Sequence, residues 1–309
     1  MSQVHHIKSR ISSAKNVGQI TKAMELVSAT KMRKAQEIAL RSRPYAFAAL
    51  ELLETLSRHG KETVFSKARE IKTTLAVIIE SDKGLAGAFN TQVERRADLF
   101  FKEDPATRVA NHTYVVMPIG AKAHHFASGR FAVAQEFAGT GDFISLLGTR
   151  HIVEAILEGF ISGRWDRVVV ISMHFRTALF QEALVRELLP VTTEHIRTSI
   201  DQIIPMHGRF SYLREGVPVM ACDDEYIFEP SPEILLEHLM PHLVTMQLYH
   251  SILEANASEH SARRVAMKTA SDNADTLMEE LTLQYNKVRQ AGITNELIEI
   301  ASTQEALAD

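Results

Sequence analysis

The sequence predicts an α/β domain threaded between two long helical chain ends. Apolar residues near the amino terminus recur at helical spacing, and strands alternate with helices in the middle of the chain. Residues 242–291 contain neither glycine nor proline. We therefore expect a helical segment 1–60, an α/β domain 61–231 and a second helical segment 232–309.

The first helix is expected over 4–56. Its apolar residues are spaced by three and four at Ile7, Ile11, Ala14, Ile20, Met24 and Val27. Gly18 is expected to interrupt this pattern, and Pro44 to bend or break the helix. A further helical stretch, "YAFAALELLETLSRHG", is expected to end at Gly60.

The middle of the chain predicts a mainly parallel sheet covered by helices on both faces. The expected strands are 73–80, 113–120, 130–137 and 166–175. The expected helices are 90–102, 121–129 and 145–163. Residues 177–225 carry no clear pattern, and "DEYIFEPSP" (224–232) is expected to form a last edge strand.

The carboxy-terminal segment predicts a helix too long for a small domain. Fifty helical residues would span roughly 75 Å. The expected stripe is rich in alanine and consists of Ala266, Ala270, Ala274, Leu277, Leu281 and Val288. Such a stripe needs another long helix beside it, and the amino-terminal helix is the candidate.

The two chain ends carry opposite charge. Residues 1–43 hold nine Lys or Arg against two Glu, whereas residues 259–309 hold five basic and nine acidic residues. This asymmetry is expected if the ends lie together, or if each faces a different partner.

Composition excludes several protein classes. With 45% hydrophobic and 23% charged residues, the chain is globular, and its net charge of −4 does not indicate nucleic-acid binding. No run of eighteen apolar residues or signal-peptide pattern is present, so we expect no transmembrane segment and a cytoplasmic protein. Any membrane association would be through a partner. The single cysteine, Cys222, cannot form a disulfide within the chain.

A nucleotide-dependent enzyme is one alternative. "SDKGLAGAFN" (81–90) follows a strand and precedes a helix, but it matches neither a Walker motif nor GxGxxG. Gly84 and Gly87 are therefore expected to serve a tight turn and close helix–sheet packing. Nucleotide binding by the isolated chain would favour the enzyme.

No catalytic residue, cofactor site or metal site is expected. The pairs His5–His6 and His124–His125 are adjacent and point apart, and His151 with Glu154 lacks a third ligand. No GxSxG motif is present, and Cys222 has no reactive signature. The sequence thus predicts a non-catalytic protein that acts by contact.

The basic residues Lys31, Arg33 and Lys34, preceded by Lys22, have two interpretations. They form either a solvated helix face or a positive band against an acidic partner. Met24 is similarly either a core or a contact residue.

Both chain ends resemble a known family. "IKSRISSAKNVGQITKAMELVSATKMRKAQ" (7–36) and "SEHSARRVAMKTASDNADTLMEELTLQYNKVRQAGITNELIEI" (258–300) resemble the two terminal signatures of the gamma subunits of F-type ATP synthases. "SDKGLAGAFN" and "YIFEPSPE" look like the family's two central landmarks, in the same order. The resemblance covers the whole chain and is weakest over 95–220.

The resemblance implies an antiparallel, left-handed coiled coil of the two ends and an inserted Rossmann-like domain that binds no dinucleotide. It implies a rotating central shaft inside a ring of three alpha and three beta subunits. The other implied partners are the epsilon subunit and the membrane c-ring, so the chain would lie at the cytoplasmic face of a bacterial plasma membrane. A coiled-coil adaptor unrelated to ATP synthesis is the other alternative, and co-purification with alpha and beta subunits would discriminate.

The resemblance also implies contact residues toward the beta subunits. Met24 lies in the "KAME" motif, and Lys31, Arg33 and Lys34, with Lys22 before them, would run beside acidic lever loops. Arg263 and Asn295 align with family positions that contact the catch region of beta. The family commonly has glutamine where Asn295 stands, and alanines occupy the places of cysteine and glycine at Ala86 and Ala88.

Overall fold

A computed structural model describes residues 2–41, 52, 56, 63–67, 69–109, 111–139, 144–191 and 228–308. The chain divides into two compact units. Residues 1–29 and 263–309 form one, here called the helix-pair unit, and residues 30–262 form the other, here called the sheet unit.

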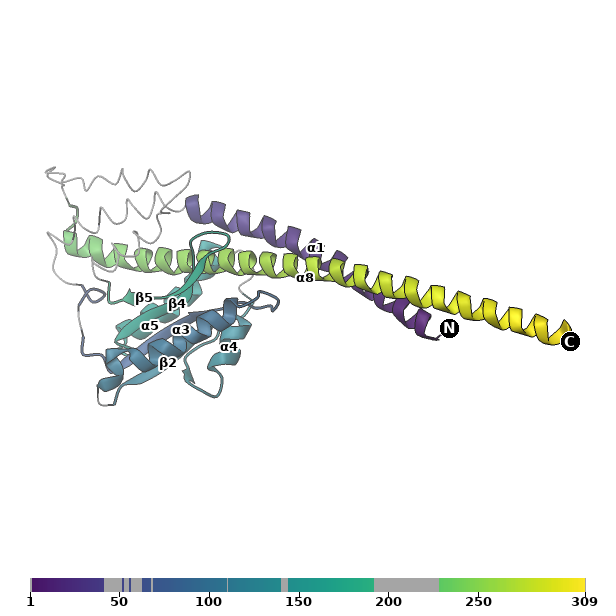
Figure 1. The fold of residues 1–309 in the computed structure, drawn as a ribbon. Helices are drawn as coiled ribbons and strands as arrows, with labels where there is room; N and C mark the ends of the chain where they lie inside the picture. The colour runs from purple at the N-terminus through teal and green to yellow at the C-terminus, as the bar shows by residue number, and fades with distance from the viewer. Residues whose placement is uncertain are drawn as a thin grey trace. The chain divides into compact units, whose positions relative to one another are not determined.

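The sheet unit contains a five-stranded sheet (Figure 1). Its strands are β1 (Thr73–Ile79), β2 (Thr113–Ile119), β3 (Ala132–Val133), β4 (Arg167–Phe175) and β5 (Gln181–Leu189). Their order is β3-β2-β1-β4-β5, and only β5 runs antiparallel to its neighbour. The central strands β1 and β4 are almost continuously apolar because both of their faces are buried.

The shorter helices of this unit are α3 (Phe89–Glu103), the 3₁₀ turn η1 (Pro105–Arg108), α4 (Ala121–Ala127) and α5 (Leu146–Ile161). Their apolar side chains join those of the strands and of residues 236–255 in a single hydrophobic core. Trp165 packs against Gly159 of α5, where no side chain could be accommodated, and donates its ring N–H to the Ile156 carbonyl oxygen at 2.9 Å.

The prediction of a mainly parallel sheet is confirmed, with two differences. The expected strand 130–137 is reduced to β3 and one isolated bridge, and β5 was not predicted. Sequence patterns miss β5 because it carries Glu182, Arg186 and Glu187, which are unusual in a strand. The described part of the expected strand 224–232 is not a strand, and the remainder lies outside the described residues.

The two long helices are α1 (Ser2–Arg41) and α8 (Pro232–Ala308), and each contributes residues to both units. Helix α8 has 77 residues and begins ten residues before the expected glycine- and proline-free stretch. Pro232 is tolerated in its first turn, and the helix continues through Pro241, whose carbonyl oxygen accepts the Thr245 hydroxyl at 2.7 Å. The expected helix 45–60 lies outside the described residues, except for Leu52 and Leu56.

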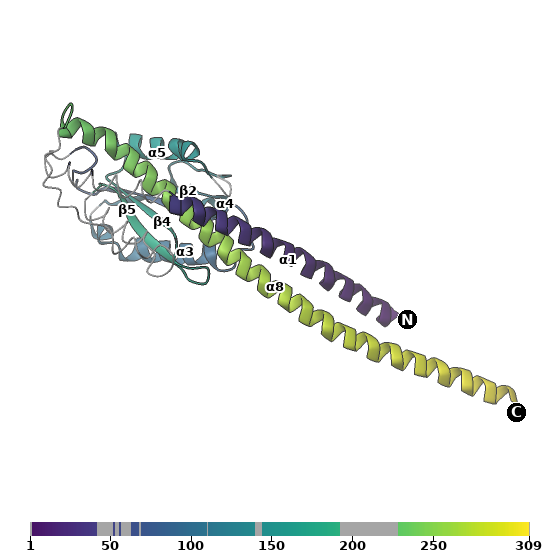
Figure 2. The ribbon, with the colours of Figure 1, turned by 90° about the horizontal axis from the view of Figure 1, so that it is seen from above.

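In the helix-pair unit, α1 and α8 run side by side in opposite directions (Figures 1 and 2). The face of α1 turned inward is Ile7, Ile11, Ala14, Gly18, Thr21, Glu25 and Ser28. The facing residues of α8 are Met267, Ser271, Ala274, Met278 and Leu281. Both sets are spaced alternately by four and three residues, so they keep a seven-residue repeat.

This inward face agrees with the predicted one at Ile7, Ile11, Ala14, Ala274 and Leu281 and differs from it at other positions. Ile20 and Val27 are 60% and 53% exposed, and Leu277 is 40% exposed. Gly18 does not interrupt α1 but lies in the contact, where it faces Ala274. The prediction followed the large apolar residues, whereas close packing of the two backbones selects small and hydroxyl-bearing ones.

The packing at Gly18 leads to a stability prediction. A Cβ atom at this position would lie 3.4 Å from the Ala274 Cβ, which is an ordinary contact. Gly18→Ala should therefore stabilise the helix pair by about 0.5–1 kcal/mol through helix propensity, whereas Gly18→Leu should destabilise it by overpacking. Thermal unfolding of the full chain, followed by circular dichroism at 222 nm, checks both changes. A lower melting temperature for the alanine variant would contradict this packing.

Candidate partner-contact surface of the two long helices

The structure places the seven sequence-predicted contact residues on α1 and α8. The helix-pair unit holds Lys22, Met24, Arg263 and Asn295, and the sheet unit holds Lys31, Arg33 and Lys34. Four of them are exposed: Lys22, Arg33, Lys34 and Asn295. Met24 and Lys31 are half-buried, and Arg263 is buried.

Lys22 is engaged within the helix pair. Its ammonium group lies 2.9 Å from a Glu25 carboxylate oxygen one turn away on α1. This hydrogen bond, with Asp272 and Asp275 on α8, raises the pKa of Lys22. A basic side chain of α1 and acidic side chains of α8 therefore lie near one another here, which fits the first of the two explanations offered for the opposite charges of the chain ends.

Glu25 is a buried carboxylate within the contact between the helices. The hydrogen bond from Lys22 lowers its pKa against the opposing effect of burial, and Lys268 and Arg264 on α8 act in the same direction as Lys22. An ionised group is stable at this position because basic groups from both helices surround it. The sequence analysis did not identify Glu25 as an inward-facing residue, because a charged residue between the apolar Met24 and Leu26 is expected to face solvent.

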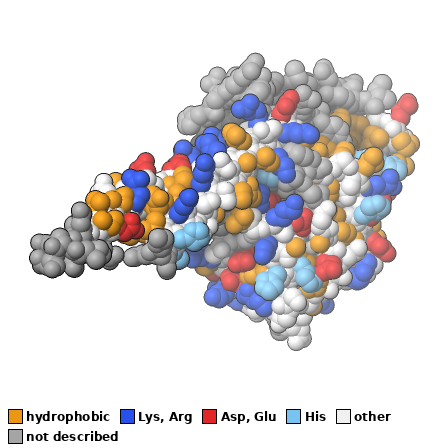
Figure 3. Space-filling model, turned by 90° about the vertical axis from the view of Figure 1, so that its right-hand side faces the viewer, with side chains coloured by type: hydrophobic (Ala, Val, Ile, Leu, Met, Phe, Trp, Pro, Cys, Tyr) orange, Lys and Arg blue, Asp and Glu red, His pale blue; other side chains and the backbone are white. Residues whose placement is uncertain are grey.

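A second apolar stripe runs along α1 beside the inward face. Val17, Ile20, Met24 and Val27 follow one another at spacings of three, four and three. Val17, Ile20 and Val27 are more than half exposed. Figure 3 shows hydrophobic side chains interspersed with basic and acidic ones on the protruding part of the molecule. A face that combines apolar and basic groups is suited to contact with another protein.

A buried ionic cluster attaches α8 to the sheet within the sheet unit. The Glu254 carboxylate accepts a hydrogen bond from Arg186 of β5 at 2.8 Å. It also lies 3.0 Å from Nδ1 of His174 on β4 and 3.2 Å from Nε2 of His250. Burial alone would raise the pKa of Glu254, but Arg186, His250 and the hydrogen bonds hold it well below its ordinary value. This cluster was not predicted, because its residues lie up to eighty positions apart.

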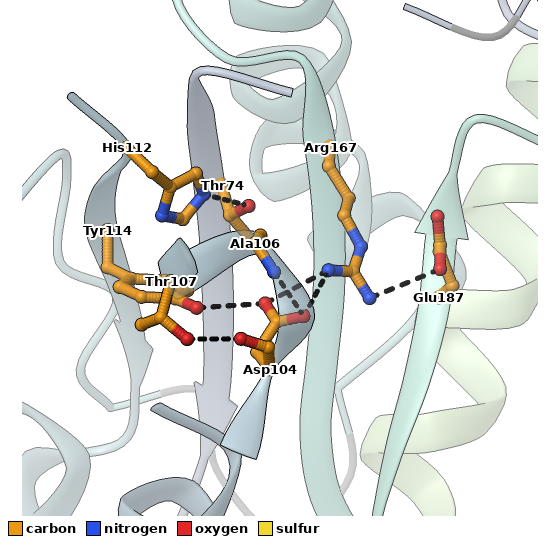
Figure 4. A network of polar contacts seen from close by, with 8 residues as sticks. All are labelled: Thr74, Asp104, Ala106, Thr107, His112, Tyr114, Arg167 and Glu187. Carbon is orange, nitrogen blue, oxygen red and sulfur yellow. Dashed lines mark hydrogen bonds and ion pairs between the residues drawn. The ribbon is translucent and has the colours of Figure 1, made fainter. Parts of the chain in front are cut away.

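A second polar network lies at the amino ends of the parallel strands (Figure 4). Buried Asp104 accepts two hydrogen bonds from Arg167 at 3.0 Å and one from the Tyr114 hydroxyl at 2.9 Å. Arg167 also pairs with Glu187 at 3.4 Å. Burial and the bond to Asp104 raise the pKa of Tyr114. Open parallel sheets bind ligands at the carboxyl ends of their strands, whereas this network lies at the amino ends. We therefore interpret the network as stabilising the fold.

The carboxyl ends of the strands carry the loop 81–88. Gly87 adopts φ +58°, which confirms the expected turn. Close packing at Gly84 is not observed, because a side chain at this position would meet nothing within 4 Å. Leu85 is exposed and also has a positive φ, +64°. Of the two alanines of this motif, Ala86 is buried and Ala88 is exposed.

The histidines considered as ligands are dispersed. His5, His6, His125 and His151 are exposed, and His124 pairs with Glu136 at 2.5 Å. In the part of the chain that the structure describes, no three His, Cys, Asp or Glu side chains are grouped to hold a metal ion. Cys222 lies outside that part. Within the same part, no helix is both long and apolar enough to cross a membrane.

Comparison with known proteins gives the family. A family model described as "ATP synthase" matches residues 3–307. The ATP synthase gamma chain of Roseiflexus castenholzii is 38% identical, and that of Opitutus terrae is 41% identical, each over 100% of both chains. The chain belongs to the ATP synthase gamma-chain family. The resemblance inferred from the terminal motifs is thus confirmed.

Solved structures of ATP synthases share the fold of this gamma-family chain. A chain of the Euglena gracilis mitochondrial ATP synthase, in an OSCP/F1/c-ring structure, matches with a TM-score of 0.62 and 18% identity, covering 99% of this chain and 95% of the other. A chain of the Tetrahymena thermophila central stalk and c-ring structure matches with a TM-score of 0.56 and 23% identity, covering 82% and 99%.

The Glu254 cluster predicts a pH-dependent stability. Because the folded-state pKa of Glu254 is depressed, its contribution is present above the unfolded pKa near 4.5 and is lost as pH falls through the folded value. Glu254→Gln removes this acid-sensitive contribution and leaves the Arg186 charge buried without its carboxylate, which should cost about 3 kcal/mol or more. Denaturant unfolding of the full chain at pH 7 and at lower pH values, down to about pH 2.5, checks both effects.

Glu154→Gln is the matched control. Glu154 pairs with Arg150 at 2.6 Å on the exposed face of α5, so its loss should change stability by less than about 0.5 kcal/mol. Equal effects of the two substitutions at pH 7 would rule out the buried cluster as the attachment of α8.

Proposed function

We propose that the chain is the rotating central shaft of a bacterial F-type ATP synthase, with alpha and beta subunits around its helix pair. We further propose that the epsilon subunit and the membrane c-ring are its other partners. The chain would then be a peripheral protein at the cytoplasmic face of the plasma membrane. Its role is to couple ion-driven rotation to ATP synthesis or hydrolysis on the beta subunits.

The helix pair is proposed to be an antiparallel coiled coil. The inward faces of α1 and α8 keep a spacing of 3.5 residues per turn, which requires a left-handed supercoil to stay in contact. The small residues Ala14, Gly18, Ser271 and Ala274 allow close approach of the two backbones. This continuous heptad contact between distant chain ends is the observation that carries the proposal.

The sheet unit is proposed to be a Rossmann-like domain without a dinucleotide. The order β3-β2-β1-β4 of the parallel strands corresponds to part of the order in doubly wound nucleotide-binding folds, and β5 departs from these folds because it runs antiparallel. The loop after β1, where such folds hold a phosphate, has the sequence "SDKGLAGA" instead of a glycine-rich fingerprint. The domain would thus provide a binding surface for other subunits instead of a nucleotide site.

Rotation has a simple physical basis in this proposal. A shaft made of one chain has no threefold symmetry, whereas three beta subunits around it do. Each beta subunit therefore meets a different face of the shaft, and the differential contact free energy favours a different conformation and nucleotide affinity at each catalytic site. Turning the shaft moves these preferences from one site to the next.

The faces of the shaft differ in charge and polarity. Exposed Arg33 and Lys34 and half-buried Lys31 form a positive band on the part of α1 in the sheet unit, and exposed Lys22 lies on the part of α1 in the helix-pair unit. These basic residues suit acidic loops of beta. Met24 would supply an apolar contact, and Asn295 would hydrogen bond to the ring. Arg263 is buried in this chain, so we propose that it acts by positioning α8 or that it contacts beta only through a small exposed part.

The positive band can be tested in the assembled enzyme. Alanine at Lys31, Arg33 and Lys34 together should reduce ATP-driven proton pumping at least severalfold, because the acidic loops lose their electrostatic partners. Pumping by reassembled complexes in vesicles is the measurement. The triple alanine variant of Arg150, Arg164 and Lys102, which are exposed basic residues of the sheet unit, should pump normally. Normal pumping by the first variant would assign its residues to a solvated face.

Asn295 gives a gain-of-contact test. Asn295→Gln restores the side-chain length common in the family, so torque-coupled ATP hydrolysis should be unchanged or raised up to about threefold, corresponding to less than about 1 kcal/mol. Hydrolysis and assembly are measured in the reconstituted complex. Loss of assembly would show that Asn295 does not occupy the proposed contact position.

A further inference from the structure

Glu80 is a buried acid that neither the helix pair nor the ionic clusters use. It follows β1 directly, at the carboxyl end of the central strands. The residue is 6% exposed, and both of its carboxyl oxygens are buried without a hydrogen-bond partner among the described residues. Buried carboxyl groups are ordinarily paired, so this one requires an explanation.

The backbone holds Glu80 firmly in this position. Its N–H donates to the Ile119 carbonyl oxygen at the end of β2, at 3.0 Å. Its own carbonyl oxygen lies against Gly120, which adopts φ +99° and where a side chain would collide with that oxygen. These contacts fix the backbone from which the buried side chain projects.

The loop 81–88 is anchored by hydrogen bonds of its first two residues, Ser81 and Asp82. The buried Ser81 hydroxyl donates to the Lys83 carbonyl oxygen at 2.8 Å and accepts from the Asn90 amide of α3 at 2.8 Å. One Asp82 carboxylate oxygen accepts from the backbone N–H groups of Ala121 and Gly139 at 3.0 and 3.1 Å. The loop conformation thus depends on anchors next to the buried acid.

Two charged groups act on the Glu80 carboxyl from the neighbouring helices. Glu94 of α3 repels a negative charge at this site, and Lys122 of α4 attracts it. Burial is the largest effect, and together these influences raise the pKa of Glu80 to about 8. The acid is therefore protonated at neutral pH and ionises in mildly alkaline solution.

We propose that Glu80 is a proton-binding switch for the loop 81–88. The protonated carboxyl is compatible with the apolar site and keeps the loop closed on its Ser81 and Asp82 anchors. Ionisation places an unpaired negative charge in the interior, and opening of the loop brings this charge to water. Nothing in the proposed rotary function requires this switch, since it acts within the chain itself.

The direction of the pH dependence follows from linkage. In the closed loop the carboxyl pKa is raised, and in the open loop it returns toward its ordinary value of 4.5. The closed loop therefore holds the proton more tightly, and opening becomes easier as pH rises between these two values, by at most about tenfold per pH unit. Above the closed-state value both states are ionised, and the dependence ends.

Amide hydrogen exchange of the full chain tests the switch. Protection factors of peptides covering 81–88 are measured from pH 6 to pH 9.5. Protection factors are used because they correct the exchange rates for their intrinsic pH dependence. In the wild-type chain, protection should fall with pH and level off near pH 8. In Glu80→Gln, which cannot ionise, protection of the same peptides should stay constant. Parallel curves for the two proteins would overturn the proposal.

Two further variants keep the test decisive if Glu80→Gln does not fold. Glu94→Gln removes the repelling charge, so the pH at which protection levels off should fall. Lys122→Met removes the attracting charge, so that pH should rise. Opposite shifts support the proposal. Shifts in one direction, or none, overturn it. Peptides from β4 serve as the internal control and should show no such dependence.

Discussion

The helix-pair unit depends on one constraint, the close approach of α1 and α8 at small residues. Gly18 and Ala274 meet directly, and the hydroxyl-bearing Thr21, Ser28 and Ser271 continue the same faces. A large side chain in place of Gly18 or Ala274 would separate the backbones at this point and disturb the seven-residue register. The larger apolar residues Ile20 and Val27 are consequently left outside the contact, where they are available to a partner.

This constraint also explains what sequence patterns could and could not give. The long helices at both ends could be predicted from apolar periodicity, and their pairing from the need of each for a long neighbour. The order of β1, α3, β2, α4, α5 and β4 could also be predicted, because each of these elements has a continuous apolar pattern. The inward face of α1 beyond Ala14 could not be predicted, because it is made of glycine, threonine, glutamate and serine. Glu25 is buried there with a hydrogen bond from Lys22 of α1 and with Lys268 and Arg264 of α8 nearby, and the part contributed by α8 is not contained in any local pattern.

The same limitation applies to the sheet unit. In strand β5, Arg186 pairs with Glu254 and Glu187 pairs with Arg167. Because these partners are distant in the sequence, the structural role of the charged residues of β5 could not be inferred from the sequence. Of the seven predicted contact residues, Lys22, Arg33, Lys34 and Asn295 are exposed, and their contact with beta subunits stays a prediction. The pairing of Lys22 with Glu25 lies within α1 at a spacing of three residues, so sequence inspection could have found it. The burial of Arg263 depends on tertiary packing, which the local sequence does not contain.

Cysteine cross-linking tests the register of the two ends most directly. In a Cys222→Ser background, which removes the single native cysteine, Gly18→Cys is combined with Ala274→Cys or with Leu281→Cys. The facing Cβ positions 18 and 274 are 3.4 Å apart, near the separation found in disulfides, whereas position 281 lies about 10 Å further along α8. Mild oxidation of the full chain should therefore form the 18–274 disulfide rapidly and the 18–281 disulfide hardly at all. Equal formation of both, or of neither, would contradict the antiparallel heptad contact on which the shaft depends.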